Sequence, residues 1–135
     1  DESVRTRLLG LEDPVFVTAD EELLERAFEN VVRNAVEAAG RGGGLVEVSA
    51  RRAEGLVDIL VEDDGPGLAA DHPGDVRPFY TTRPGGLGLG LPLARKIVLL
   101  HGGALRLEGG TIGGARVTVS LPAGGPDAQL TQAAR

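Results

Sequence analysis

Hydrophobic and polar residues alternate along four stretches of the chain, and this period of two predicts half-buried β-strands. The stretches are residues 45–52, 56–63, 104–108 and 115–121. A short link, Ala53-Glu54-Gly55, joins the first two, and a glycine-rich turn joins the last two, so we expect two hairpins. Residues 4–8 and 15–17 alternate more briefly and predict two short strands at the start of the domain.

Two further stretches repeat their apolar residues with the period of an amphipathic helix. The first ends at Gly40 after about twenty residues, and Thr18 with Glu21 forms a capping-box pattern at its start. Its expected core stripe consists of Leu24, Phe28, Val31 and Ala35. The second helix is expected over residues 89–101, before Gly102-Gly103.

The remaining segments show no sustained period. Residues 65–86 are rich in proline and glycine, which is typical of a long, loosely specified loop, and such loops are usually functional or disordered. The residues after Pro122 are expected to form a disordered tail. We therefore predict one domain over residues 1–122 and a tail over residues 123–135. The order of strands and helices predicts an α/β fold, a two-layer sandwich in which helices pack on one face of a mixed sheet.

Composition restricts the function without naming it. The 135 residues suit one domain, and a formal charge of -6 disfavours a surface that binds nucleic-acid phosphates. The absence of cysteine excludes disulfides and thiolate metal sites. No apolar run is long enough to cross a membrane, so we expect a cytoplasmic domain without direct membrane contact, whose parent protein could still be membrane-anchored.

Three polar side chains share one flank of the first predicted helix. Asn30, Asn34 and Glu37 fall together beside the core stripe when successive residues are placed about 100° apart. Asparagine is a mediocre helix former, so two of them four residues apart need a reason. They could form a polar shoulder facing water, or their amide oxygens could bind Mg²⁺ whose other ligands are water and phosphate.

Asp63 ends the second of the predicted strands and is followed by Gly65 and Gly67. Alternation puts its side chain on the face that should pack against the helices, where an unpaired carboxylate is costly. The two glycines would let the backbone turn sharply and admit a flat ligand, and a carboxylate in an apolar slot suits the exocyclic amine of adenine. The alternative is an Asp-Gly turn with Asp63 at an exposed strand end.

A glycine-rich segment leads into the second predicted helix. It reads Thr82-Arg83-Pro84-Gly85-Gly86-Leu87-Gly88-Leu89-Gly90. Alternating glycines expose backbone N–H groups at a helix start, where the helix dipole also favours anions, so the segment could cradle phosphates. It is neither a Walker A loop nor a dinucleotide fingerprint. A flexible linker is the alternative, although leucine between the glycines is unusual in linkers.

Taken in this order, the motifs resemble the N, G1, F and G2 boxes of the histidine kinase ATPase family, which also includes gyrase, MutL and heat-shock chaperone ATPases. The matching segments are residues 29–35, 63–67, 78–83 and 86–91. The stretch Asn-Ala-Val-Glu-Ala at residues 34–38, together with Thr81-Thr82, is similar to the nitrogen-regulator sensor branch. The resemblance covers about residues 4–122 and implies the Bergerat-type ATP-binding fold.

The resemblance also implies roles for particular residues. Asn34 is implied as the Mg²⁺ ligand with Asn30 beside it, Asp63 as the adenine contact, and residues 68–86 as a mobile lid over ATP. The implied catalytic residues are Asn30, Asn34 and Arg83. The implied nucleotide-binding residues are Asn30, Asn34, Glu37, Asp63, Gly65, Gly67, Thr82, Arg83, Gly86, Gly88, Leu89 and Gly90.

Several positions depart from the family pattern. Arg83 stands where members of this branch usually have Lys, and Leu87 replaces a Thr, so one hydroxyl on the phosphate side is missing. Val76 replaces the first Phe of the F box. The final box, Gly113-Gly114-Ala115-Arg116-Val117, lacks its usual Thr and aromatic residue and therefore identifies little.

The resemblance implies a protein histidine kinase catalytic domain. Such a domain binds Mg-ATP and transfers the γ-phosphoryl group to a histidine of a dimerisation and phosphoacceptor domain outside this chain, with a response regulator as an indirect partner. An ATP-binding regulatory module or an anti-sigma-type serine kinase is the alternative. A hydrolase of the gyrase or MutL type is disfavoured, because Asn30 stands where those enzymes carry the Glu that activates water.

The two histidines receive structural interpretations. His72 lies in the long loop before Pro73 and is expected to be solvated. His101 ends the second predicted helix, where a cation would suit the dipole. Neither is expected to accept phosphate or bind a metal.

Overall fold

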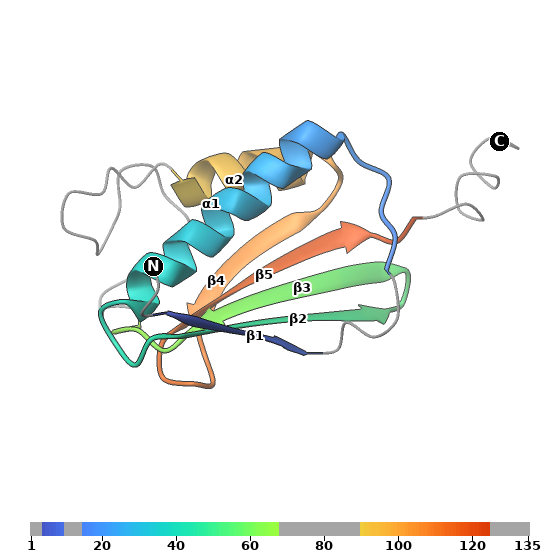
Figure 1. Cartoon of the computed structure of the whole chain (residues 1–135). Coiled ribbons are helices and arrows are strands. Elements are labelled where there is room, and N and C mark those ends of the chain that lie inside the picture. The colour runs from blue at the N-terminus through green and yellow to red at the C-terminus, as the bar shows by residue number, and fades with distance from the viewer. Residues whose placement is uncertain (1–3, 10–14, 68–89, 125–135) are drawn as a thin grey trace, which may run out of the picture.

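The computed structural model describes residues 4–9, 15–67 and 90–124. Within them, two helices cover one face of a five-stranded sheet (Figure 1). The elements in chain order are β1 (Arg5–Leu9), α1 (Glu21–Ala39), β2 (Leu45–Ala53), β3 (Leu56–Asp63), α2 (Gly90–Leu100), β4 (Ala104–Gly109) and β5 (Ala115–Pro122). The sheet order is β1-β2-β3-β5-β4, with β1 parallel to β2 and the other neighbours antiparallel. The predicted two-layer α/β sandwich with a mixed sheet is confirmed.

Both predicted hairpins form, and the first is tighter than its sequence suggested. Ala53 pairs with Leu56, which leaves only Glu54 and Gly55 in the turn. These two residues have φ values of 55° and 78°, the positive values of a type I′ turn, whose twist matches that of the flanking strands. The turn is therefore one residue shorter than predicted, because Ala53 belongs to the ladder.

The prediction of a second short strand at residues 15–17 is wrong, since these residues are not in a strand. The carbonyl oxygen of Phe16 accepts a hydrogen bond from Gly124 N at 2.6 Å, just beyond the end of β5. Two alternating apolar residues indicate that one side of an extended segment is partly buried. A β-strand also requires a neighbouring strand that continues the hydrogen-bonded ladder.

Helix α1 is capped by a different residue from the one predicted. The carboxylate of Asp20 accepts a hydrogen bond from Leu23 N at 3.0 Å, so Asp20 is the N-cap and the predicted Thr18 and Glu21 capping box is wrong. Aspartate caps a helix at least as well as threonine. Starting at Glu21 also keeps acidic side chains in the first turn, where they favour the helix dipole. The helix ends at Ala39, and Gly40 follows as its C-cap, as predicted.

The buried stripe of α1 contains smaller side chains than predicted. It consists of Ala27, Val31, Ala35 and Ala39. Leu24 and Phe28, which were predicted in the stripe, are half-buried and pack at the edge of the core. Small residues let α1 pack closely on the apolar side chains from α2 and the sheet, which are Ala94, Ile97, Val98, Val46, Val61, Leu105, Leu107, Val117, Val119 and Leu121. Within the described part of the chain, neither helix is long and apolar enough to cross a membrane.

The two helices run in opposite directions, and His101 joins α1 to α2 at one end. Asp20 N donates a hydrogen bond to His101 Nε2 at 3.0 Å, and His101 Nδ1 lies 2.8 Å from the carbonyl oxygen of Ile97. The ring thus connects the start of α1 to the end of α2. The expected effect of a cation on the helix dipole stays a prediction.

Candidate functional site

The carboxylate of Asp63 is buried at the end of β3. Its residue is only 3% exposed and lies on the same strand face as the buried Val57 and Val61, which excludes the alternative of an exposed turn. Oδ1 of Asp63 accepts hydrogen bonds from Gly65 N at 2.9 Å and from Ala115 N at 3.3 Å. One donor belongs to the following loop and the other to β5, so the carboxylate is oriented from two sides.

Burial raises the pKa of Asp63, because water is removed from its ionised form. The hydrogen bonds from the Gly65 and Ala115 amides act in the opposite direction and lower the pKa, as does the charge of Arg41, but burial prevails. A carboxylate in this state gains most from a ligand that supplies another donor. This is the chemistry expected of an adenine contact, a role that remains a prediction.

Glycines let separate backbone segments meet at this carboxylate. A Cβ on Gly114 would overlap Asp63 Oδ1, and one on Gly65 would overlap the carbonyl oxygen of Ala38 at the end of α1. Gly67 has a φ of 78°, and a Cβ there would lie 3.6 Å from the carbonyl oxygen of Gly114. The predicted sharp turn after Asp63 is confirmed at Gly67, while Gly65 serves close packing against α1.

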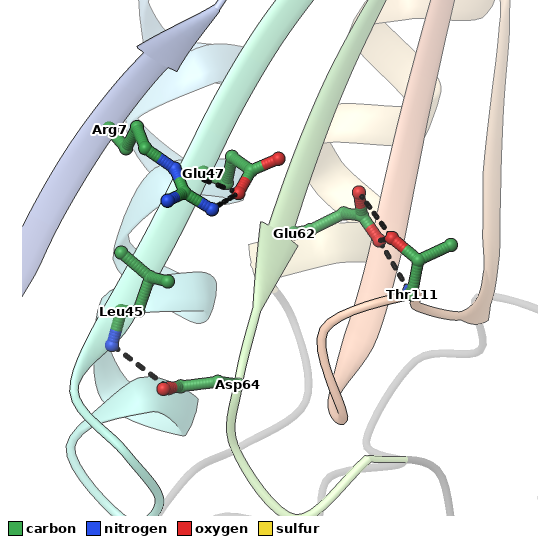
Figure 2. Close-up of polar contacts among 6 residues, drawn as sticks. All are labelled: Arg7, Leu45, Glu47, Glu62, Asp64 and Thr111. Atoms are coloured by element: carbon green, nitrogen blue, oxygen red, sulfur yellow. Dashed lines mark hydrogen bonds and ion pairs between the residues drawn. The ribbon is translucent and has the colours of Figure 1, made fainter.

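The segment Gly113-Gly114-Ala115, which seemed to identify little in the sequence, lies against Asp63 in the structure. Sequence reasoning also missed Glu62, whose buried carboxylate accepts a hydrogen bond from Thr111 N at 2.7 Å (Figure 2). The available signal was weak: consecutive glycines before a strand mark a close backbone approach, but the pattern does not say what is approached.

Asp64 fixes the connection between α1 and β2. Its Oδ1 accepts a hydrogen bond from Leu45 N at 2.9 Å (Figure 2). Its own amide donates to the carbonyl oxygen of Leu45 at 3.1 Å. A Cβ on Gly43 would overlap the Asp64 carboxylate, and one on Gly42 would overlap its carbonyl oxygen. The two adjacent aspartates thus have different roles. The Asp64 side chain accepts a hydrogen bond from the backbone of β2, while the Asp63 side chain lies on the face of the sheet that the helices cover.

The polar flank of α1 lies next to the start of α2. Asn30 and Asn34 are half-buried and Glu37 is exposed, which fits their predicted place beside the core stripe. A Cβ on Gly90 would lie 3.6 Å from Asn30 Oδ1, so the first residue of α2 adjoins Asn30. A helix N-terminus has unpaired N–H groups and a positive dipole end, and both attract anions.

Part of the predicted site lies outside the described residues. This holds for the lid over residues 68–86 and for Thr82, Arg83, Gly86, Gly88 and Leu89, whose roles stay predictions. The described chain stops at Gly67, close to Asp63, and resumes at Gly90, next to Asn30. Gly67 and Gly90, the described residues on either side of this segment, therefore adjoin the two halves of the predicted site.

Acidic or imidazole clusters do not supply a metal site in the part of the chain that the structure describes. Across residues 4–9, 15–67 and 90–124, no three His, Cys, Asp or Glu side chains form a group that could hold a metal ion. Mg²⁺ needs few protein oxygens when phosphates and water supply the rest, and an amide oxygen is a suitable donor. Asn34 fits that chemistry, and its role as the ligand stays a prediction.

The fold of this chain is similar to that of solved structures. The mycobacterial sensor histidine kinase MprB superposes with a TM-score of 0.76 and 29% identity, covering 90% of this chain and 83% of that one. The ATP-binding domain of PrrB from Mycobacterium tuberculosis gives a TM-score of 0.70 and 29% identity, covering 91% of this chain and 82% of that one.

Sequence relatives are sensor and sporulation kinases. Sporulation kinase C of Bacillus subtilis is 33% identical over 82% of this chain, and the nitrogen regulation protein NtrY of Azorhizobium caulinodans is 37% identical over 84% of it. The chain spans 26% and 16% of these two proteins, respectively. Residues 19–125 match the family described as histidine kinase-, DNA gyrase B-, and HSP90-like ATPase. The chain therefore belongs to this ATPase family, as an ATP-binding catalytic domain of the sensor histidine kinase type.

Proposed function

We propose that the domain holds the adenine of ATP at Asp63 and passes the γ-phosphoryl group to a histidine on a phosphoacceptor and dimerisation domain outside this chain. The observation that carries the proposal is the buried Asp63 carboxylate, oriented by two backbone amides and surrounded by glycines. The exocyclic amine of adenine would donate to this carboxylate. A hydrogen bond to a charged acceptor contributes about 1.5 to 3 kcal/mol.

The phosphates would extend from Asp63 toward the polar flank of α1. Asn34, with Asn30 beside it, would bind Mg²⁺, which neutralises phosphate charge when present. The N-terminus of α2 adjoins Asn30 and would donate N–H groups to the phosphates. Arg83 and Thr82 would add a cation and a hydroxyl from the segment before α2.

The acceptor has to come from elsewhere. Asn30 cannot take a proton from water, which disfavours hydrolysis as the outcome of binding. The sensor kinase relatives support a histidine acceptor, with a response regulator as the indirect partner. The reaction would take place in the cytoplasm, where ATP is available, and the parent protein could be anchored to a membrane through a segment outside this domain.

The adenine assignment is tested by changing Asp63 to alanine. Loss of the charged acceptor should weaken ATP and ADP alike by roughly 10- to 150-fold, and wild type should bind GTP poorly because its carbonyl would face the carboxylate. Isothermal titration calorimetry measures all of these affinities. The matched control is Asp58→Ala, which removes a carboxylate from the same strand on the opposite face and should leave ATP affinity unchanged. Equal wild-type affinity for ATP and GTP would contradict the assignment.

A further inference from the structure

The turn between β4 and β5 contacts the end of β3 on both faces of the sheet. Glu62 and Asp63 are consecutive strand residues, so their side chains point to opposite faces. On the helix face, a Cβ on the turn residue Gly114 would overlap Asp63 Oδ1, and Ala115 N, at the start of β5 directly after the turn, donates to that oxygen at 3.3 Å. On the other face, Thr111 approaches Glu62, as Figure 2 shows. One turn therefore connects the buried carboxylate at the candidate site to a second carboxylate behind it.

Glu62 is built into this turn by several hydrogen bonds. It is 7% exposed, and its Oε1 accepts from Thr111 N at 2.7 Å. Thr111 Oγ1 lies 3.1 Å from Oε1 and 3.3 Å from Oε2 of the same carboxylate. Gly110 N also donates to the carbonyl oxygen of Gly114 at 2.8 Å, which closes the turn. Together with the β3–β5 ladder, in which Glu62 pairs with Arg116, these short hydrogen bonds attach the turn to β3.

The opposite attachment is the weaker one. The bond from Ala115 N to Asp63 is 3.3 Å long, beyond the usual range for N–H donors, whereas the bond from Gly65 N is 2.9 Å. A small outward shift of the turn would break the longer bond first. Asp63 Oδ1 would then keep only the bond from Gly65 N, and the carboxylate would be less firmly oriented.

We infer that Glu62 is a positioning residue for base recognition: through Thr111 it holds the β4–β5 turn against Asp63 and so sets the preference for a base that carries an amine. The inference rests on the proposed function, because it assumes that Asp63 receives the amine. Glu62 itself faces away from the helices and touches no part of the proposed nucleotide path.

A purely structural role for Glu62 would involve its cross-strand neighbour. Arg116 pairs with Glu62 in the register of β3 and β5, but its ion pair is with Glu108 at 3.5 Å. Among the described residues, Arg116 Nε is buried without a hydrogen-bond partner. The hydrogen bonds that the structure gives the Glu62 carboxylate lead to Thr111, and this favours a role in placing the turn.

The test compares ATP with purine riboside triphosphate, which lacks the exocyclic amine. The dissociation constant of purine riboside triphosphate divided by that of ATP, both measured by calorimetry, reports recognition of the amine separately from binding of the phosphates and sugar. Glu62→Leu should lower this ratio on the order of 5-fold, the equivalent of one ordinary hydrogen bond. Thr111→Val, which keeps the backbone donor and removes the hydroxyl, should lower it by a smaller factor. Glu62→Gln should preserve the ratio, because the amide oxygen still accepts from Thr111 N.

Two controls keep the inference open to contradiction. Asp58→Asn changes another outward-facing carboxylate of β3 and should leave the ratio unchanged. Thr111 is exposed, so Thr111→Val decides the matter if Glu62→Leu fails to fold. An equal loss of affinity for both nucleotides, or an unchanged ratio in both variants, would overturn the positioning role alone. A wild-type ratio of one would overturn the adenine contact as well.

Discussion

Asp63 has opposite effects on stability and on binding. Its carboxylate is buried at the end of β3, where ionisation is unfavourable, and burial raises its pKa in spite of two backbone donors. In the proposed complex that cost becomes useful, because a poorly hydrated acceptor binds a donor more strongly than a hydrated one does. Residues that break local rules in this way are expected at functional sites.

The first prediction at the residue scale concerns Asp63→Asn. The folded-state pKa lies above 3.8, the ordinary value, so ionisation of Asp63 destabilises the fold at neutral pH and stops doing so below 3.8. Asparagine is uncharged, and its oxygen can still accept from Gly65 N and Ala115 N. The variant should therefore gain free energy of unfolding over wild type at neutral pH, and the gain should shrink as the pH falls. Urea unfolding across the pH range in which both proteins fold measures this. A gain that does not vary with pH would contradict the prediction.

Asn34→Ala should act on a different part of binding. The ligand lost serves the metal and phosphates, so affinity for ATP without Mg²⁺ should hardly change, while the increase in affinity on adding Mg²⁺ should shrink. Titrations with and without Mg²⁺ give both quantities. Val32→Ala, an exposed change on the same helix, is the control and should keep the full Mg²⁺ effect. If Asn34→Ala also keeps it, Asn34 is only a polar residue on the helix shoulder.

At the scale of elements, sequence patterns predicted the interiors of elements well and their ends poorly. Alternation over β3 placed Asp63 on the helix face, and the 3.6-residue period placed Asn30 and Asn34 on one flank. The cap at Asp20 was missed because Thr18 offered an equally good oxygen two residues earlier. A cap depends on which of two local hydrogen bonds the tertiary structure permits, and here the bond from Asp20 N to His101 selects the later start.

His101 leads to a prediction about helix ends. Replacing it with alanine removes an acceptor for Asp20 N and a donor to Ile97 O, at a cost of about 1 kcal/mol per hydrogen bond. Amide exchange should become faster at the start of α1 and the end of α2, as detected by hydrogen–deuterium exchange. ATP affinity should change less than about 2-fold, since a contact remote from the ligand alters binding only indirectly.

The control for this experiment is the neighbouring Leu100, which is 69% exposed. Leu100→Ala shortens an adjacent side chain without touching the connection between the helices, so exchange at the start of α1 should stay as in wild type. Equal acceleration in both variants would show that the effect comes from general fraying of α2.

At the scale of the molecule, the end of β3, the end of α1 and the β4–β5 turn lie at one end of the sandwich (Figure 1). Asp63, the β4–β5 turn and the C-terminal end of α1 lie at that end, where Gly65 packs on Ala38. The β2–β3 turn and the end of β5 lie at the opposite end, since Leu56 pairs with Pro122. This gathering follows from chain topology, because antiparallel neighbours bring the end of β3 beside the start of β5.

The topology also shows why the site was only partly predictable. Asp63 and Asn34 can be recognised as candidates from the residues next to them in sequence. Glu62 and Thr111, in contrast, are separated by 49 positions and come into contact only when the sheet forms. Neither residue type is unusual in its local context. A single sequence carries no record of such a contact, so the supporting residues behind the site came from the structure.

The last prediction tests the proposed division of labour between this domain and its acceptor. Incubated alone with radiolabelled ATP, the chain should bind nucleotide without labelling itself, and turnover should stay below a few per minute, because Asn30 offers no base. Adding the parent protein's phosphoacceptor segment should produce acid-labile, base-stable phosphate on that segment. Label on this chain alone would favour a serine kinase, and rapid turnover alone would favour a hydrolase.

The tight turn at Glu54 and Gly55 has a practical use. The side chain of Glu54 is exposed, whereas Gly55 has to stay glycine because of its positive φ, and the turn lies at the end of the sheet away from Asp63. Exposed hairpin tips of this kind tolerate chemical tags and inserted peptides. A fluorophore or tether attached there would allow immobilisation of the domain while leaving access to the opposite end open.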